Sequence, residues 1–382
     1  MRLLLFFLFY YFFLFWYSVN FLSFSIVEVR SIEHFWPLKY IMEISVLMFG
    51  KNDIALRIPS LLFSALSVMI FYHISKKYFK KFNDIFFTTI IFALIPGFII
   101  SSLIINKSVY LIFLTLLFIF LYFEGEKISY LLLFLLAFVD YSFISLYIGL
   151  IFYSIYKKYN KLLIFSLFLL ALNANIFNYS ISGKPKGYFL DVIGTYILIF
   201  SPFVFIYFLY AIYKGFFQKK DIIFFVSITS FLLSVIFSFR QRIKIDDYAP
   251  FVLPYIIYMV KVYLNSYRVR LPKLRMGYKI IFIFLFFSMI LFDVLLFYNK
   301  YTPARNLSES FYFIKPLSKV LKRQNIDSIS CNNKFLCKAL NFYGIKSGNK
   351  YKIYYSKKRK RVSIFHNKKK IYEIDVSKLN IL

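Results

Sequence analysis

Apolar residues fall in long blocks along the first 300 residues of the chain, and short polar stretches separate these blocks. Many of the blocks approach twenty residues, the length that a helix needs to cross a hydrocarbon layer about 30 Å thick. The pattern predicts about eleven membrane-spanning helices, and the two short blocks in 129–156 meet at Asp140. The blocks cover residues 2–24, 58–74, 85–104, 109–123, 129–142, 143–156, 162–180, 188–213, 222–238, 248–264 and 280–298.

The composition agrees with a membrane protein. Of the 382 residues, 60% are hydrophobic, 23% are aromatic and 17% are charged, whereas soluble domains are about 45–50% apolar and about 25% charged. The mean hydropathy is +0.68. These values exclude an ordinary soluble domain and the disordered, collagen-like and disulfide-scaffold classes.

The net charge of +31 divides the chain into two parts. Residues 301–382 hold 19 Lys and Arg against 4 Asp and Glu, so about half of the excess charge lies in this polar tail. We therefore expect a transmembrane domain at 1–300, with a first extracytoplasmic loop at 25–57, and a small C-terminal domain at 301–382. Alternating and helical patterns predict a mixed α/β fold for the tail, with helices at 317–324 and 334–342 and strands at 328–331, 351–355, 361–365 and 370–375.

Basic residues at the ends of the blocks predict the orientation of the chain. Placing the N-terminus in the cytoplasm leaves 17 Lys and Arg in cytoplasmic segments and 11 on the opposite side, as the positive-inside rule requires. An odd number of spans then makes the tail extracytoplasmic. Residues 2–24 lack a small-residue cleavage site, which favours a retained span over a signal peptide.

Two features of the tail leave alternatives open. Cys331 and Cys337 are spaced to close a small disulfide loop in an oxidising compartment, but two free thiols are equally compatible with the spacing. The basic run 357–361 is compatible with nucleic acid, with anionic headgroups or glycans, or with a solvated turn. Its extracytoplasmic position argues against nucleic acid. Two Cys and the isolated His34 do not fill a metal shell, so we predict no metal and no cofactor.

The first loop combines acidic and basic residues close to the membrane. Glu28, Arg30, Glu33 and His34 precede a second stretch, 38–50, whose apolar residues and flanking charges predict a helix lying in the membrane interface. Ionisable residues at membrane depth are costly and are therefore functional candidates.

Several motifs of the chain resemble one enzyme family. Arg57-Ile-Pro59-Ser60 opens the second block, and Lys76-Lys77 closes it. Further motifs occur in the same order along the chain as in that family. Glu28-Val-Arg30 resembles part of an acidic motif in loop one. The family's later motifs are resembled by Pro37-Leu38, by Pro96-Gly97 and by the Ser238…Lys244…Tyr248…Pro254 pattern. Together they resemble the polyprenyl-phosphate-sugar-dependent glycosyltransferases of the GT-C fold, which include protein O-mannosyltransferase-like enzymes and lipid A aminoarabinose transferases.

The resemblance implies an all-α polytopic membrane fold with a small extracytoplasmic domain, located in a bacterial inner membrane. It also implies a polyprenyl-phosphate sugar as donor, a lipid, glycan or protein as acceptor, membrane lipids as neighbours and no nucleic acid. The chain departs from the family at two acids. Val27 stands where the family has a loop-one Asp, and no acid lies near Lys107-Ser108-Val109, where the family has a second.

Sugar transfer from a lipid phosphate needs a base for the acceptor hydroxyl and cations for the phosphate that leaves. Glu28 is the leading candidate for the base and Glu33 the second. The candidates for holding the phosphate are Arg30, Arg57, Arg242, Lys244 and Tyr248.

Each candidate also has a structural alternative. Glu28 and Glu33 could be solvated loop acids, and Arg57 could extend along the membrane interface. Asp246 and Asp247 could pair with the preceding cations and only shape a loop, and Asp140 could mark a turn. For the whole chain, the alternatives are a transporter or flippase of a lipid-linked glycan, against which the lack of internal repeats argues, and a catalytically degenerate family member.

Overall fold

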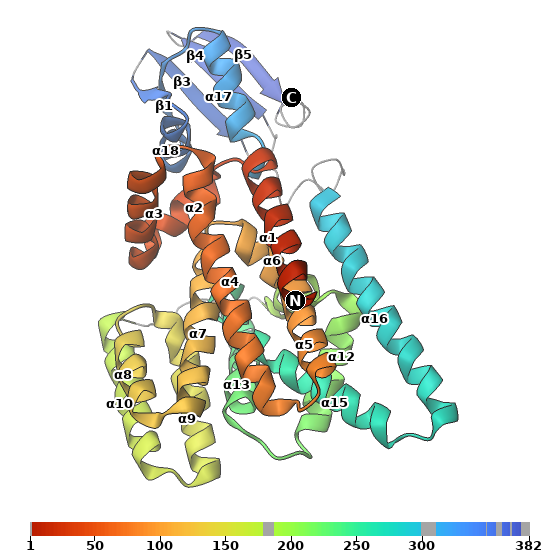
Figure 1. The fold of residues 1–382 in the computed structure, drawn as a ribbon. Coiled ribbons are helices and arrows are strands. Elements are labelled where there is room, and N and C mark those ends of the chain that lie inside the picture. The colour runs from red at the N-terminus through yellow and green to blue at the C-terminus, as the bar shows by residue number, and fades with distance from the viewer. Residues whose placement is uncertain are drawn as a thin grey trace. The chain divides into compact units, whose positions relative to one another are not determined.

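A computed structural model describes residues 2–178, 187–298, 311–348, 350–356, 361–366 and 369–375 (Figure 1). Contacts divide the chain into two compact units. Unit 1 comprises Met1–Leu61, Leu103–Asn106 and Leu295–Leu382. Unit 2 comprises Leu62–Ser102 and Lys107–Val294. These units do not test the predicted domain boundary at residue 300, which stays a prediction.

Unit 1 joins the N-terminal helices to the C-terminal tail. The polar stretch after the first block forms a helix, which the sequence pattern did not predict, and the interfacial stretch at 38–50 is helical, as predicted. The helices are α1 (Arg2–Phe21), α2 (Ile26–His34), α3 (Trp36–Phe49), the first turns of α4 (Asp53–Tyr78), α17 (Ile314–Arg323) and α18 (Lys334–Phe342).

The tail contains a five-stranded mixed sheet in the order β2-β1-β3-β4-β5 (Figure 1). β1 runs parallel to β2 and β3, and β3, β4 and β5 are antiparallel, with Ile353 of β3 opposite Ile364 of β4. The mixed α/β fold predicted for the tail is confirmed. Residues 357–360 of the basic run lie outside the described residues. The strands are β1 (Ser328–Cys331), β2 (Lys346–Ser347), β3 (Tyr351–Ser356), β4 (Arg361–His366) and β5 (Lys369–Asp375).

Specific polar contacts bind the tail to the first loop within unit 1. The hydroxyl of Tyr343 accepts from the backbone N–H of Phe24 at 2.8 Å and donates to Asp53 at 2.8 Å. Nζ of Lys315 lies 2.6 Å from the same aspartate. Burial, reinforced by Asp53, raises the pKa of Tyr343, so the phenol stays protonated and can donate. The start of α4 is thus fixed to α17 and α18.

Unit 2 is a bundle of apolar helices. The apolar blocks of this region are mainly helical where the structure describes them, and several blocks are divided between two or more helices. Besides the rest of α4, the helices are α5 (Phe82–Leu94), α6 (Pro96–Leu103), α7 (Lys107–Glu124), α8 (Glu126–Leu136), η1 (Tyr141–Phe143), α9 (Ile144–Lys157), α10 (Asn160–Ile176), α11 (Phe189–Phe200), α12 (Pro202–Gly215), α13 (Ile222–Ser238), η2 (Ile245–Asp247), α14 (Ala249–Val252), η3 (Leu253–Tyr255), α15 (Ile256–Val269) and α16 (Pro272–Tyr298). The last residue of α6 and the last residues of α16, from Leu295 on, belong to unit 1.

Small residues and internally bonded hydroxyls allow these helices to pack closely. A Cβ on Gly149 of α9 would lie 2.8 Å from Cα of Val226 in α13, so the two backbones meet at this glycine. Hydroxyls inside the helices donate to carbonyls one turn earlier, as Thr115 does to Leu111 at 2.7 Å and Ser154 does to Leu150 at 2.6 Å. These bonds satisfy polar groups that have no water to contact in an apolar bundle.

The lengths of the helices fit a membrane protein. Among the described residues, four helices are long and apolar enough to cross a bilayer, namely α1, α4, α7 and α16. Two further pairs pass the test together but are bent, α5–α6 by 59° and α11–α12 by 103°. The structure therefore agrees with a polytopic helical protein, while the count of eleven spans stays a prediction.

Candidate functional site

Among its described residues, each unit contains a cluster of interacting charged side chains that are largely buried. The Glu28 cluster consists of Ser25, Glu28 and Arg57 with nearby backbone groups, and it belongs to unit 1. The Lys107 cluster consists of Lys107, Ser108, Asp140, Tyr141, Ser142, Asp246 and Asp247, and it belongs to unit 2.

The start of α2 orients Glu28. Ser25 caps the helix, since its hydroxyl accepts from the backbone N–H of Glu28 at 3.2 Å, while Oε2 of Glu28 accepts from the backbone N–H of Ser25 at 2.8 Å. This reciprocal capping box satisfies two backbone donors that the first turn would otherwise leave free. It also fixes the direction of the Glu28 side chain.

The other carboxylate oxygen of Glu28 accepts from the core of unit 1. Nη1 of Arg57 lies 2.5 Å from Oε1, and the backbone N–H of Ile105 donates to the same oxygen at 3.0 Å. Arg57 also donates to the carbonyls of Leu103 at 3.0 Å and Ser23 at 3.2 Å. The pair holds the segments at 23–28, 57 and 103–105 together.

Burial distinguishes this pair from both structural alternatives. Glu28 is 0% exposed and Arg57 is 1% exposed, so neither a solvated loop acid nor an interfacial arginine describes them. Both oxygens of Glu28 already accept hydrogen bonds. To remove a proton from an acceptor, Glu28 would have to exchange one of these bonds for the acceptor hydroxyl.

The remaining loop-one candidates lie on the exposed side of α2 and contact α18. Glu33 forms an ion pair with Lys338, and this hydrogen bond lowers the pKa of Glu33. The guanidinium of Arg30 lies 5.1 Å from the centre of the Phe335 ring, a cation–π contact. The structure thus separates Glu28 from Arg30 and Glu33, because the first points into the core of unit 1 and the others into its contact with α18.

In the Lys107 cluster one cation lies between two carboxylates. Nζ of Lys107 is 2.9 Å from Oδ1 of Asp140 and 2.6 Å from Oδ1 of Asp247. It also lies 4.3 Å from the centre of the Tyr141 ring. The side chain of Lys107 is 13% exposed and those of both aspartates are 7% exposed, so the charges interact with little screening by water.

Hydroxyl groups complete the same cluster. Tyr141 donates to Oδ2 of Asp247 at 2.5 Å, and Ser108 donates to Oδ1 of Asp246 at 3.0 Å. The phenol of Tyr141 therefore acts as a hydrogen-bond donor within the cluster. Asp140 caps η1 by accepting from the backbone N–H of Ser142 at 2.9 Å.

A small pocket opens beside this cluster. Its polar wall is formed by Tyr141, Ser142, Ser145, Asp247 and Tyr248, and its apolar wall includes Leu233 and Phe237. Tyr248 is therefore buried at the pocket, whereas Arg242 and Lys244 are exposed in the segment that leads to η2. Unit 2 brings Tyr248 to the cluster and leaves the two cations accessible.

The sequence reasoning missed the Lys107 cluster. It considered Asp246 and Asp247 only as partners of the cations that precede them, and it found no acid near Lys107. The structure instead pairs Lys107 with Asp140 and Asp247, which lie 33 and 140 positions further along the chain, far beyond the reach of local patterns. One feature of the sequence could have indicated this cluster. Its charged residues lie at or near the ends of apolar blocks, where ionisable residues are costly.

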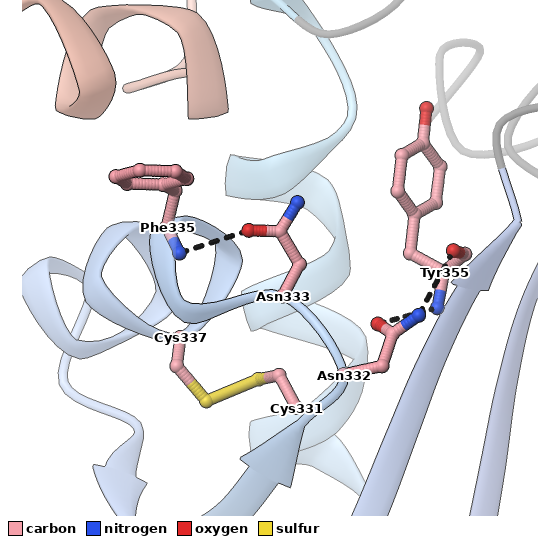
Figure 2. The surroundings of a disulfide bond; sticks show 6 residues. All are labelled: Cys331, Asn332, Asn333, Phe335, Cys337 and Tyr355. Carbon is pink, nitrogen blue, oxygen red and sulfur yellow. Dashed lines mark hydrogen bonds between the residues drawn. A yellow bond between two sulfur atoms is a disulfide. The ribbon is translucent and has the colours of Figure 1, made fainter.

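Cys331 and Cys337 form a disulfide, which settles the alternative that the spacing left open (Figure 2). It connects the end of β1 to the first turn of α18. Asn333, between the two cysteines, caps that helix by accepting from the backbone N–H of Phe335 at 2.9 Å. Asn332 bonds to the backbone of Tyr355 on β3. Among the described residues, no group of three or more His, Cys, Asp or Glu side chains is arranged to hold a metal.

Comparison with known proteins finds similarity in structure alone. No family model and no curated protein sequence matches the chain. A crystal structure of ArnT from Cupriavidus metallidurans bound to undecaprenyl phosphate matches with a TM-score of 0.55 and 11% identity, over 89% of this chain and 74% of that one. The chain shares the fold of ArnT. The apo structure of ArnT matches over the same shares with a TM-score of 0.52 and 10% identity.

ArnT is a lipid A aminoarabinose transferase of the GT-C fold. The resemblance predicted from Arg57-Ile-Pro59-Ser60 and the accompanying motifs is therefore confirmed at the level of the fold. At 11% identity the similarity assigns no role to any residue. The roles predicted for Glu28, Glu33, Arg30, Arg57, Arg242, Lys244 and Tyr248 stay proposals.

Proposed function

We propose that the protein is a membrane glycosyltransferase that moves a sugar from a polyprenyl-phosphate donor to a lipid, glycan or protein acceptor at the outer face of a bacterial inner membrane. One observation carries the proposal, the fold shared with ArnT over 89% of the chain. The ArnT structure holds undecaprenyl phosphate, a lipid phosphate of the kind that the proposed donor would leave behind.

The proposed reaction is a direct displacement at the anomeric carbon. The acceptor oxygen forms a bond to this carbon while the bond from the carbon to the phosphate oxygen breaks, and the configuration inverts. A carboxylate takes the proton of the acceptor hydroxyl, and the polyprenyl phosphate leaves with the electron pair. Cations that stabilise the phosphate lower the barrier because its negative charge grows as the bond breaks.

Arg242, Lys244 and Tyr248 are the proposed phosphate ligands. The first two are exposed cations on one short segment, and Tyr248 lies on the neighbouring pocket wall. Arginine can make paired hydrogen bonds to phosphate oxygens, and lysine adds a compact positive charge. Arg57 is a weaker candidate, since Glu28 already occupies its guanidinium.

Besides Glu33, which its ion pair with Lys338 makes the weaker candidate, two carboxylates compete for the role of the base. Glu28 remains the candidate from the motif, although it would have to release one of its present partners. Asp246 is the alternative that the structure adds, because its side chain is partly exposed and lies beside the Lys107 cluster. Replacing the true base with its amide should lower kcat about 100- to 10,000-fold, whereas the other amide variant should change kcat much less.

The disulfide supports the proposed orientation. Structural disulfides persist in oxidising compartments and are rare in the cytosol of most bacteria. A tail that carries the Cys331–Cys337 bond is therefore expected on the outer side of the membrane. With the N-terminus in the cytoplasm, this placement agrees with the distribution of basic residues.

Reconstitution tests the proposal. The purified protein in liposomes would receive a radiolabelled polyprenyl-phosphate sugar and a membrane extract as the source of acceptor. A labelled glycoconjugate that wild type forms and that Glu28→Gln or Asp246→Asn fails to form supports transfer. Movement of the donor across the bilayer without a new glycosidic bond would instead support a flippase. Absence of both activities with all common donors would favour a catalytically degenerate member of the fold.

A further inference from the structure

A second charged feature of unit 1 has no part in the proposed reaction. α17, the end of α18, β2 and the turn before α4 surround an open cavity of about 640 Å³. Cavities that bind small ligands occupy about 300–1,000 Å³. The charged residues that line this cavity are Lys51, Asp53, Lys315, Lys319, Lys322 and Lys346.

The spacing on α17 directs three lysines to one side of the helix. Residues 315, 319 and 322 are separated by four and three positions, so they lie along the same helical face. On the opposite face, Leu317 and Leu321 are buried. Arg323, the next residue after Lys322, does not line the cavity.

Within the described part of the chain, one of the five cavity lysines has an acidic partner. Asp53 is paired with Lys315 at 2.6 Å and accepts from Tyr343 at 2.8 Å. Among the described residues, no carboxylate lies within ion-pairing distance of Lys51, Lys319, Lys322 or Lys346. The cavity therefore has five cations against one anion, a net charge of +4.

The backbone helps to position one of these ammonium groups. Gly344 has a φ of +92°, and a Cβ at this position would lie 3.2 Å from Nζ of Lys322. A glycine thus permits both the left-handed turn after α18 and the close approach of the lysine. Like charges gathered without counter-ions repel one another, and an anionic ligand would relieve this repulsion.

We propose that this cavity binds a phosphate-bearing headgroup. The ammonium groups supply hydrogen-bond donors and positive charge for the phosphate oxygens. Asn52 and Asn341, which also line the cavity, supply amide groups for the hydroxyls of an attached sugar or glycerol. The cavity lies on the face formed jointly by the tail and loop one, and the binding does not depend on the transferase activity.

The experiment compares two triple variants of the full-length protein in nonionic detergent. Lys319→Gln/Lys322→Gln/Lys346→Gln removes three cavity lysines, and Arg323→Gln/Lys334→Gln/Lys352→Gln removes the same charge from the tail outside the cavity. Binding of inorganic pyrophosphate is measured by calorimetry at low and at physiological salt. We expect the cavity variant to bind about tenfold more weakly than wild type and the matched control to bind within about twofold of it.

A second arm identifies the source of the phosphate. The titration is repeated in nanodiscs of phosphatidylcholine alone and of phosphatidylcholine with phosphatidylglycerol. If phosphatidylglycerol suppresses pyrophosphate binding in wild type, the bilayer supplies the headgroup; if binding persists, the ligand is a glycan or soluble phosphate. Equal weakening in both triple variants, or no binding of pyrophosphate to wild type in detergent, would overturn the proposal. Thermal unfolding verifies that each variant is folded, and the single variants Lys319→Gln and Lys322→Gln replace a triple that is not.

Discussion

The Glu28 cluster and the Lys107 cluster both contain a largely buried cation paired with carboxylate, but they differ in the number of carboxylates per cation. Arg57 meets one carboxylate, and their other partners are nearly all backbone groups from three segments of the chain. Lys107 is shared by two carboxylates and also contacts the hydroxyl of Ser142 and the ring of Tyr141, while a third carboxylate, Asp246, accepts from the neighbouring Ser108. The first is a balanced pair, whereas the second has an excess of negative charge.

The difference indicates different roles. A balanced pair with its hydrogen bonds satisfied by backbone fixes local structure, and removal of either partner leaves a buried charge without compensation. A cluster with spare acceptors beside a pocket can exchange protons or bind a substrate group with small rearrangements. We therefore infer that the Glu28 cluster stabilises the structure of unit 1. Of the two clusters, the Lys107 cluster in unit 2 is the more suitable for a part in the proposed reaction.

The largest effect is expected at Arg57. Arg57→Met leaves Glu28 buried without a cation and should lower the free energy of unfolding by about 3–5 kcal/mol. Thermal unfolding of the detergent-solubilised protein measures the change, with Arg323→Met as a control on the exposed surface. The double variant Glu28→Met/Arg57→Met should recover part of the loss, since no buried charge remains. A single variant as stable as the control would show that the pair does not organise unit 1.

A smaller effect is expected at Lys107. Lys107→Met removes a cation shared by Asp140 and Asp247 and leaves these carboxylates only their hydroxyl and backbone partners, so we expect a loss of about 2–3 kcal/mol. Thermal unfolding measures the loss, with Lys107→Arg as the variant that keeps the positive charge. An equal loss in Lys107→Arg and Lys107→Met would indicate that the packing of the side chain, rather than its charge, matters.

Tyr141→Phe tests a single donor of the Lys107 cluster. It removes the hydrogen bond to Asp247 while it keeps the ring over which Lys107 lies, and it should cost about 1–2 kcal/mol. Tyr40→Phe is a suitable control, because Tyr40 is exposed on α3. If transfer activity falls while stability does not, the phenol contributes to the reaction rather than to the fold.

The smallest effect is expected at Glu33, the exposed counterpart of Glu28. Its ion pair with Lys338 lies at the surface and should contribute less than about 1 kcal/mol. Because the pKa of Glu33 is lowered in the folded state, this contribution is present above the ordinary value of 4.5 and is lost as the pH falls through the folded-state pKa. Thermal unfolding should show a gap between wild type and Glu33→Gln near neutral pH that closes in acid. A gap that widens in acid would contradict this assignment.

Much of the fold could be predicted from local patterns. The apolar blocks predicted helices, and the alternation of residues in the tail predicted β1, β3, β4 and β5. Both predictions were possible because the buried face of a helix or strand produces a regular spacing of apolar residues in the sequence. Glu28 and Arg57 could be selected as candidates because their motifs are local. That they would bond to each other could not be predicted, since 29 residues separate them and the pairing depends on how α2, α4 and residues 103–105 pack.

Composition and periodicity alone indicate a helical, apolar and basic protein with a mixed α/β tail, because they reflect how each segment meets lipid or water. Which charges meet depends on how the helices pack. The packing pairs Arg57 with Glu28, places Lys107 between Asp140 and Asp247 and joins Cys331 to Cys337. Among the residues that the structure describes, it also leaves four lysines around one cavity without carboxylate partners. Charge pairing acts over a few ångströms in space, and positions far apart in the chain reach that distance only when the helices pack.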